Sequence, residues 1–157
     1  MAVLSLPRFA APVVAALALA FVVAACSKTP PATGAATPGS PADFTQNVGD
    51  RILFVVDQST ITPTAAATLD KQAAWLNKYP KYQITVEGHA DERGTREYNI
   101  ALSARRADSA RNYLASRGVS TGRLRTIAYG KERPVAVCDD ESCWTQNRRA
   151  VTVLNGG

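Results

Sequence analysis

Four short apolar segments in the chain predict β-strands. Residues 51–56 form a run rich in β-branched and aromatic side chains, which is typical of a buried strand. Residues 82–87 alternate between apolar and polar side chains, which is the period of a strand with one buried face. Residues 124–129 and 150–154 predict two more strands.

Two segments between these strands have the period and the boundary residues of helices. Thr62 can cap the first helix, the proline that follows suits its first position, and Pro80 stops it. Thr95 can cap a longer helix over residues 96–117, and Gly118 suits its C-terminal end. The first helix carries one apolar stripe, formed by Ala66, Leu69, Ala73 and Leu76.

The order of these elements predicts an α/β domain, an α+β sandwich, over residues 43–157. The chain runs β-α-β-α-β-β, so we expect two main helices on one face of a mixed four-stranded sheet. Residues 130–149, between the last two strands, are expected to form a long loop.

The first residues of the chain have the pattern of a secretory signal peptide. Arg8 is the one charged residue of segment 1–25, and an apolar stretch follows it. Residues 23–26, Val-Ala-Ala-Cys, resemble the lipobox of bacterial lipoproteins, in which small residues precede the cysteine that receives the lipid. We therefore expect residues 1–25 to be removed and Cys26 to be lipidated. The alternative is an N-terminal membrane anchor.

Residues 26–42 are expected to form a lipidated cysteine and a disordered tether. Pro, Ala, Thr, Gly and Ser dominate this segment, so it cannot bury enough apolar surface to offset the entropy lost on ordering. Lipid on Cys26 would hold the chain at a membrane. By the sorting rule for lipoproteins of enteric bacteria, Ser27 in place of aspartate favours the outer membrane.

Composition then excludes several classes of function. A chain of 157 residues is short for a multidomain enzyme, and 46% hydrophobic residues exclude a fully disordered protein. The net charge of +5 is not gathered in a run, so we expect no nucleic-acid partner. One His and three Cys without a CxxC or HxxxH pair argue against a zinc site, and no cofactor is expected.

A polar loop between two glycines is the first candidate site. Residues 88–94 follow the second predicted strand, precede a helix, and include His89, Asp91, Glu92 and Arg93. Proteins of the α/β class place ligand contacts in such loops. The helix N-terminus that follows favours an anionic group nearby.

Arg106 is the second candidate, because it points inward from the second helix. At about 100° per residue it shares a sector with Asn99 and Ser103, whereas Arg105 and Arg111 point away. A guanidinium on the inward face must be paired or must line a cleft.

Several motifs together resemble the OmpA-like peptidoglycan-binding family and, within it, the peptidoglycan-associated lipoproteins. They are VEGHADERGT at 86–95, YNIALS at 98–103, RRA at 105–107, YGKE at 129–132 and NRRA at 147–150. The resemblance implies the OmpA-like fold and fits the lipobox and the tether.

The resemblance also implies a ligand, the meso-diaminopimelate residue of the wall's stem peptide, whose distal carbon carries a carboxylate and an ammonium. Arg106 matches the residue that binds the carboxylate, and Asp91 the one that binds the ammonium. Asn99 matches a residue that hydrogen-bonds the same group. Asp57 and Arg148 match further contacts.

The family further implies a non-enzymatic link between outer membrane and peptidoglycan within the Tol–Pal system, which supports outer-membrane constriction during cell division. The periplasmic propeller protein TolB and other Tol proteins would be its partners. One alternative is an OmpA-like lipoprotein of another envelope machine. Another is a hydrolase or metal enzyme built on His89, Asp91 and Glu92. A contact between Asp91 and Arg106 could also be a purely structural ion pair.

Cys138 and Cys143 set this chain apart from the better-known members of the family. An exported domain meets an oxidising compartment, so we expect a disulfide between them. Two free thiols are the alternative.

Overall fold

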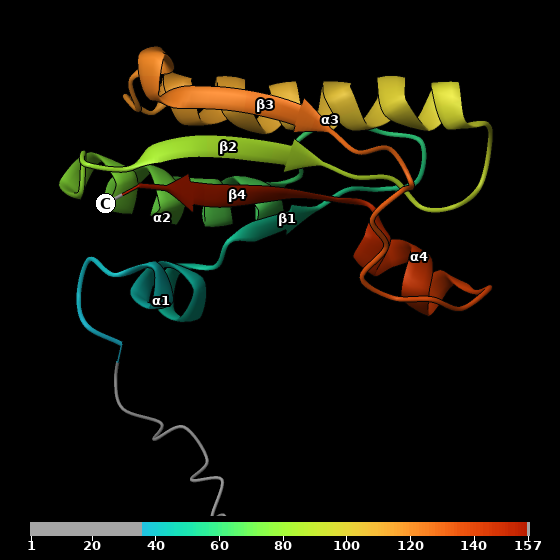
Figure 1. Ribbon diagram of the computed structural model, residues 1–157, viewed down its shortest axis with the longest axis horizontal. Helices are drawn as coiled ribbons and strands as arrows, with labels where there is room; N and C mark the ends of the chain where they lie inside the picture. The colour runs from blue at the N-terminus through green and yellow to red at the C-terminus, as the bar shows by residue number, and fades with distance from the viewer. Residues whose placement is uncertain (1–35, 157) are drawn as a thin grey trace, which may run out of the picture. The chain divides into compact units, whose positions relative to one another are not determined.

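A mixed four-stranded sheet is the centre of residues 36–156, the part of the chain that this computed structural model describes (Figure 1). Its strands are β1 (Arg51–Leu53), β2 (Gln83–Gly88), β3 (Leu124–Ala128) and β4 (Arg149–Asn155). They lie in the order β1, β4, β2, β3, with β2 parallel to β3 and β4 antiparallel to both of its neighbours. The predicted mixed sheet is confirmed.

The register brings the C-terminal ends of β1 and β2 to the same end of the sheet. Ala150 of β4 lies opposite Ile52 of β1 on one side and opposite Gly88 of β2 on the other. The chain leaves β1 just after Ile52 and leaves β2 at Gly88. The two loops that follow therefore emerge beside each other.

Helices α2 (Pro63–Lys78) and α3 (Arg96–Ser116) cover one face of the sheet, as predicted (Figure 1). Thr62 accepts a hydrogen bond from the backbone N–H of Ala65, and Thr95 accepts one from Tyr98, so both predicted caps are formed. The apolar sides of the helices and the sheet meet in a core that includes Ile52, Leu69, Leu76, Ile84, Val86 and Leu114.

The contact between α3 and the end of β2 depends on Gly88. A Cβ atom at this position would lie 1.9 Å from the carbonyl oxygen of Ser103 on α3. Any side chain there would push the helix away from the sheet. Glycine thus fixes the distance between α3 and the loop that begins at His89.

Strand β1 is shorter than the predicted strand 51–56. Phe54 still donates its backbone N–H to the carbonyl oxygen of Arg148 (2.8 Å), but Val55 and Val56 are about half exposed. Asp57 has a φ of 62°, a left-handed conformation that ends the extended backbone. The apolar run is therefore a short strand followed by the start of a loop.

Packing begins before residue 43, where the predicted domain starts. Two short helical segments precede β1, namely α1 (Pro41–Asp43) and the π-helix Phe44–Val48. The Tyr82 hydroxyl donates to the carbonyl oxygen of Gly39 (2.8 Å), and Trp75 Nε1 donates to the Asp43 carboxylate (2.8 Å). Residues 39–42 therefore pack as part of the folded unit.

A short helix, α4 (Glu141–Asn147), lies within the segment predicted as a loop. A disulfide joins Cys138 to Cys143 across the start of this helix, as expected. Asp140 caps the helix by accepting the backbone N–H of Ser142 (2.8 Å). At its other end, the Asn147 side chain accepts the backbone N–H groups of residues 135 and 136.

The predicted signal peptide, the lipidated Cys26 and most of the predicted tether lie outside the described residues. The expectations for residues 1–35 stay predictions. Within residues 36–156, no helix is long and apolar enough to cross a membrane.

Candidate functional site

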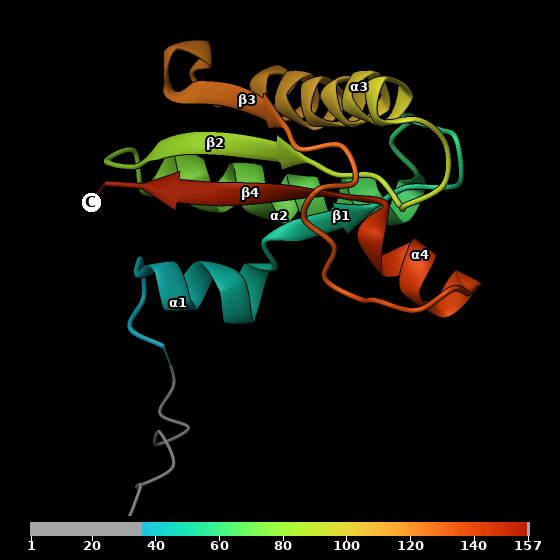
Figure 2. The ribbon, with the colours of Figure 1, turned by 45° about the vertical axis from the view of Figure 1, so that its right-hand side comes forward.

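The loops after β1 and β2, together with the first half of α3, enclose a pocket of about 250 Å³. Figure 2 shows these loops at the end of the sheet where α4 also lies. Four predicted site residues line the pocket, namely Asp57, Asp91, Asn99 and Arg106. The fold therefore brings these four predicted residues, which are far apart in the chain, into one pocket.

A larger groove, of about 410 Å³, runs beside β1. Threonine and aliphatic side chains make up most of its lining, and its one charged lining residue, Arg51, is paired with Asp50 (2.8 Å between Nε and Oδ1). The smaller pocket is the better candidate for a charged ligand because it gathers carboxylates and guanidinium groups.

Arg106 joins the two loops of the pocket and is fully buried. Its Nε lies 2.8 Å from the carbonyl oxygen of Gln58, and its Nη2 lies 3.2 Å from that of Val55, both in the loop after β1. Its Nη1 donates to the carbonyl oxygen of His89 in the loop after β2 (2.9 Å). Burial lowers the pKa of Arg106 to about 10, which leaves the guanidinium charged at neutral pH.

Asp91 is held by two arginines. Nη2 of Arg93 lies 2.8 Å from Oδ2 of Asp91, and both Nε and the backbone N of Arg93 lie 3.2 Å from Oδ1. Nη1 of Arg148 lies 3.2 Å from Oδ2. Burial acts to raise the pKa of Asp91, but the hydrogen bonds from Arg93 and Arg148 outweigh it and hold the pKa below its ordinary value. Asp91 is therefore a carboxylate at neutral pH.

Asp91 and Arg106 face the same pocket without pairing with each other. Among residues 36–156, no ion pair or hydrogen bond joins their side chains, so the structural ion pair considered from the sequence is not formed. The pocket therefore presents a separate anion and a separate cation on its walls.

Asp57 and Asn99 fix the edges of the pocket. The Tyr98 hydroxyl donates to the Asp57 carboxylate, and this bond raises the pKa of Tyr98. Nδ2 of Asn99 donates to the carbonyl oxygen of Arg93 (2.7 Å) and so ties the polar loop to α3.

Arg148 lies behind the pocket and is absent from its lining. Its side chain is only 5% exposed, and its Nε lies 3.2 Å from the carbonyl oxygen of Phe54. Its Nη2 contacts the Glu141 carboxylate and the Thr145 hydroxyl on α4. Arg148 is therefore placed to hold the Asp91 carboxylate in position.

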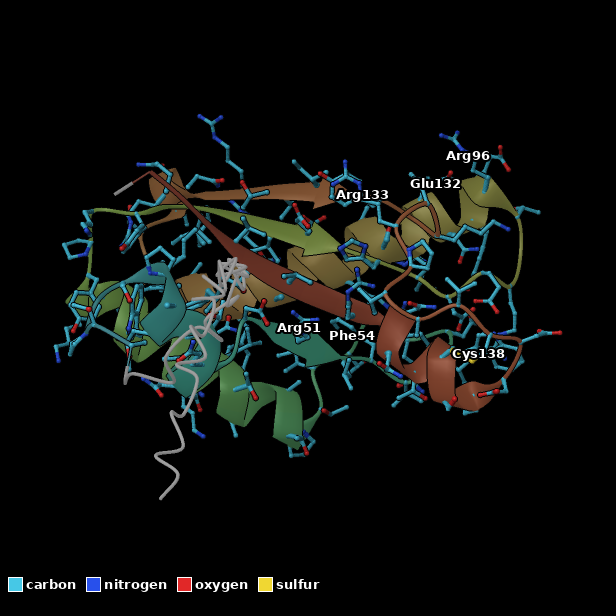
Figure 3. The ribbon with its side chains drawn as sticks, turned by 60° about the horizontal axis from the view of Figure 1, so that its bottom comes forward. Arg51, Phe54, Arg96, Glu132, Arg133 and Cys138 are labelled. Atoms are coloured by element: carbon cyan, nitrogen blue, oxygen red, sulfur yellow. A yellow bond between two sulfur atoms is a disulfide. The ribbon has the colours of Figure 1, made fainter. Side chains whose placement is uncertain are left out.

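Three residues at the site were given no role by sequence reasoning, namely Arg93, Tyr98 and Trp144. Trp144 lies on α4, where its Nε1 donates to the Glu92 carboxylate and its ring lies 4.0 Å from the guanidinium carbon of Arg93. Figure 3 shows Cys138 beside α4, at the end of the molecule where Arg96 and Glu132 also lie. The one sequence signal for Trp144 is that this aromatic residue directly follows Cys143 of the cysteine pair.

His89 is absent from the lining of the pocket and is buried directly after the end of β2. Its side chain is 2% exposed, it stacks on Tyr129 (5.5 Å between ring centres), and neither ring nitrogen has a hydrogen-bond partner among the described residues. Burial and the nearby charges of Arg149 and Arg133 lower the pKa of His89 to about 4. The ring is therefore neutral at physiological pH.

The structure does not gather His89, Asp91 and Glu92 into one site. Asp91 is bonded to arginines and Glu92 to Trp144, while the carboxylate near His89 is Glu87, with 3.7 Å between Nε2 and Oε2. Within the described part of the chain, no group of three or more His, Cys, Asp or Glu side chains is arranged to hold a metal ion.

Comparison with protein families matches residues 53–149 to the OmpA family. Peptidoglycan-associated lipoprotein from Rhizobium meliloti is 62% identical over 155 residues, which cover 92% of this chain and 88% of that protein. The protein of the same name from Brucella suis is 61% identical over 92% of both chains. In Haemophilus influenzae the identity is 46%, over 71% of this chain and 72% of that protein.

Solved structures show the same fold. The crystal structure of the peptidoglycan-associated lipoprotein from Burkholderia pseudomallei has a TM-score of 0.69 and 35% identity, and the match covers 74% of this chain and 100% of that one. The C-terminal domain of Helicobacter pylori MotB has a TM-score of 0.65 and 24% identity, over 69% of this chain and 85% of that one. The second likeness extends to the fold alone.

Proposed function

This chain belongs to the OmpA family, and from that membership we propose that it is a lipoprotein that binds peptidoglycan non-covalently and links the outer membrane to the cell wall. The observation that carries the proposal is a pocket whose lining includes the carboxylate of Asp91 and the guanidinium of Arg106, which are not paired with each other. Such a site suits a ligand that carries both charges.

The ligand that we propose is the diaminopimelate residue of the stem peptide. Arg106 has five N–H donors, of which three are used by backbone carbonyls, so two are left for a carboxylate. Asp91 would accept the ammonium on the same carbon. Asn99 and Asp57 line the same pocket and would add hydrogen bonds, and Arg148 would act through Asp91.

Binding to two kinds of cell wall tests this proposal. The protein with Cys26→Ser, purified without lipid, should sediment with peptidoglycan that contains diaminopimelate and much less with peptidoglycan that contains lysine. Free diaminopimelate should compete, whereas lysine should not. Equal sedimentation with both kinds of peptidoglycan would show that the pocket does not recognise the distal carboxylate, which diaminopimelate has and lysine lacks.

The wider role follows from the relatives that bear the lipoprotein name. We propose that residues 1–25 are removed, that Cys26 is lipidated, and that residues 26–38 tether the domain to the outer membrane, facing the periplasm. The protein would act by binding and not by catalysis.

Within the Tol–Pal system, TolB and other Tol proteins are the proposed partners, and a TolB surface would overlap the pocket. Co-purification of TolB from detergent-solubilised membranes tests this assignment. Recovery of a motor or secretion complex in its place would assign the chain to another envelope machine.

A further inference from the structure

The carboxylate of Asp91 has no free acceptor site in this structure. A carboxylate accepts about four hydrogen bonds, two on each oxygen. Oδ1 accepts from the backbone N and the Nε of Arg93, and Oδ2 accepts from Nη2 of Arg93 and Nη1 of Arg148. A ligand ammonium can therefore bind Asp91 only if one of these donors leaves.

The donors differ in how firmly they are held. The Arg148 side chain is 5% exposed and has further partners in Phe54, Glu141 and Thr145. The backbone N of Arg93 is fixed by the turn, and α3 holds that turn through Asn99. The Arg93 side chain is 40% exposed, and its other contact is the face of the Trp144 ring. The Arg93 guanidinium is thus the donor that can move.

We propose that the Arg93 guanidinium holds, in the free protein, the place on Asp91 that the ligand's ammonium takes, and that it leaves Asp91 when the ligand binds. The inference rests on the proposed function, because it concerns the same pocket. The guanidinium already lies over the Trp144 ring, 4.0 Å from its centre, and can keep this cation–π contact after it leaves Asp91, so the move does not leave it without a partner.

This exchange makes Arg93 a specificity-determining residue. A ligand that brings an ammonium replaces one cation on Asp91 with another, and the charge next to the carboxylate is conserved. A ligand with carboxylates alone cannot replace Arg93, which stays in place and adds its positive charge to that of Arg106. Removal of Arg93 should therefore change the affinities for these two ligands in opposite directions.

Calorimetric titration of the unlipidated protein with meso-diaminopimelate and with pimelate, which lacks both amino groups, tests the exchange. Arg93→Ala should bind diaminopimelate about two- to fivefold more tightly, since an internal competitor is gone, and pimelate about two- to fivefold more weakly. Arg93→Lys, which keeps the charge, should stay closer to the wild type for pimelate.

Arg96→Ala is the matched control. Arg96 follows Arg93 closely in the chain, is 67% exposed and pairs with Glu132 (3.2 Å between Nε and Oε1), without a contact to Asp91. The same loss of charge there should leave the ratio of the two affinities unchanged.

A direct measurement is the side-chain Nε–H signal of Arg93 in ¹⁵N-labelled protein, which should shift when diaminopimelate is added because Nε loses its hydrogen bond to Asp91. Weaker binding of both ligands by Arg93→Ala, or an unchanged Arg93 signal in the bound state, would overturn the exchange while the proposed function stands. A wild-type protein that binds neither diaminopimelate nor wall would overturn both.

Discussion

Arg106 lines the pocket and also holds it together, because its three carbonyl partners belong to both loops. Any ligand that contacts this guanidinium therefore contacts the link between the loops after β1 and β2. The stability of the fold and the affinity for the ligand are joined in one side chain, and substitutions at this position should affect both.

Replacement of Arg106 by alanine should lower the free energy of unfolding by roughly 3 kcal/mol, since one buried and two partly buried carbonyls lose a charged donor. Wall binding should be lost in the same variant. Urea denaturation and wall sedimentation measure the two effects. Arg105→Ala, on the outward face of α3, is the control and should change neither. Equal effects of the two substitutions would contradict the assignment.

His89 should make the free energy of unfolding depend on pH between about 4 and 6.5. Its pKa in the folded protein is about 4, against an ordinary value of 6.5. Between these values the unfolded chain binds a proton that the folded protein does not. The free energy of unfolding should therefore fall as pH decreases from about 6.5 to 4, by up to about 3 kcal/mol, and this contribution should level off below pH 4.

His89→Phe is the comparison for that measurement, because it keeps a ring on Tyr129 and neither ring nitrogen of His89 has a hydrogen-bond partner within residues 36–156. Denaturation curves of the two proteins at several pH values should diverge below pH 6.5. Parallel curves would mean that the pKa of His89 is the same in the folded and unfolded states.

Sequence reasoning at the level of single residues found the inward residue of a helix but not its partners. The helical period placed Arg106 inside, and the family motif added Asp91. Two of the three carbonyl oxygens that hold Arg106 come from residues 48 and 51 positions away, which no local pattern encodes. Arg93 appeared as one charge in a polar loop, and only the geometry around Asp91 gave it a role.

Among the elements, α2 and α3 were predictable because each has a capping threonine and an apolar side that matches the helical period. Helix α4 has only seven residues, which is too short for its period to be recognised. Its position depends on the disulfide, on the Asp140 cap and on the Asn147 side chain, and these act only after the loop has folded back on itself.

The disulfide should stabilise α4 more than the whole domain. The loop that it closes is short, so the chain-entropy model gives about 2 kcal/mol. The double variant Cys138→Ala/Cys143→Ala should lower the melting temperature by several degrees and should accelerate hydrogen exchange in residues 138–148. The same exchange in α2 should be slower and less affected. Equal acceleration in both helices would show that the bond supports the entire fold.

At the scale of the whole molecule, the proposed lipid on Cys26 would convert wall binding into a link between layers. Cys26→Ala should leave an uncleaved or soluble chain that still binds wall, because the pocket does not depend on the anchor. Fractionation of cells, with an antibody against the domain, should show loss of the protein from the outer membrane. Undiminished recovery in that fraction would refute lipidation at Cys26.

The mixed four-stranded sheet could be predicted as a class, since strands that alternate with helices leave few arrangements. The N-terminal boundary could not. Residues 38–42, Pro-Gly-Ser-Pro-Ala, have the composition of a linker. Their place in the domain depends on distant residues, since Tyr82 bonds Gly39 and Trp75 bonds Asp43, which itself accepts the backbone N–H of Gly39.

The attachment of the tether and the pocket lie at opposite ends of β2. Gly39 is bonded to Tyr82, just before the strand begins, whereas Asp91 follows soon after Gly88, where the strand ends. Tension between the membrane and a wall-bound pocket would therefore run along the strands. Hydrogen bonds between strands lie across that direction, so such a load must shear several of them at once instead of opening them one by one. We expect the domain to bear a pull between the two layers of the envelope better than a sheet loaded from its side.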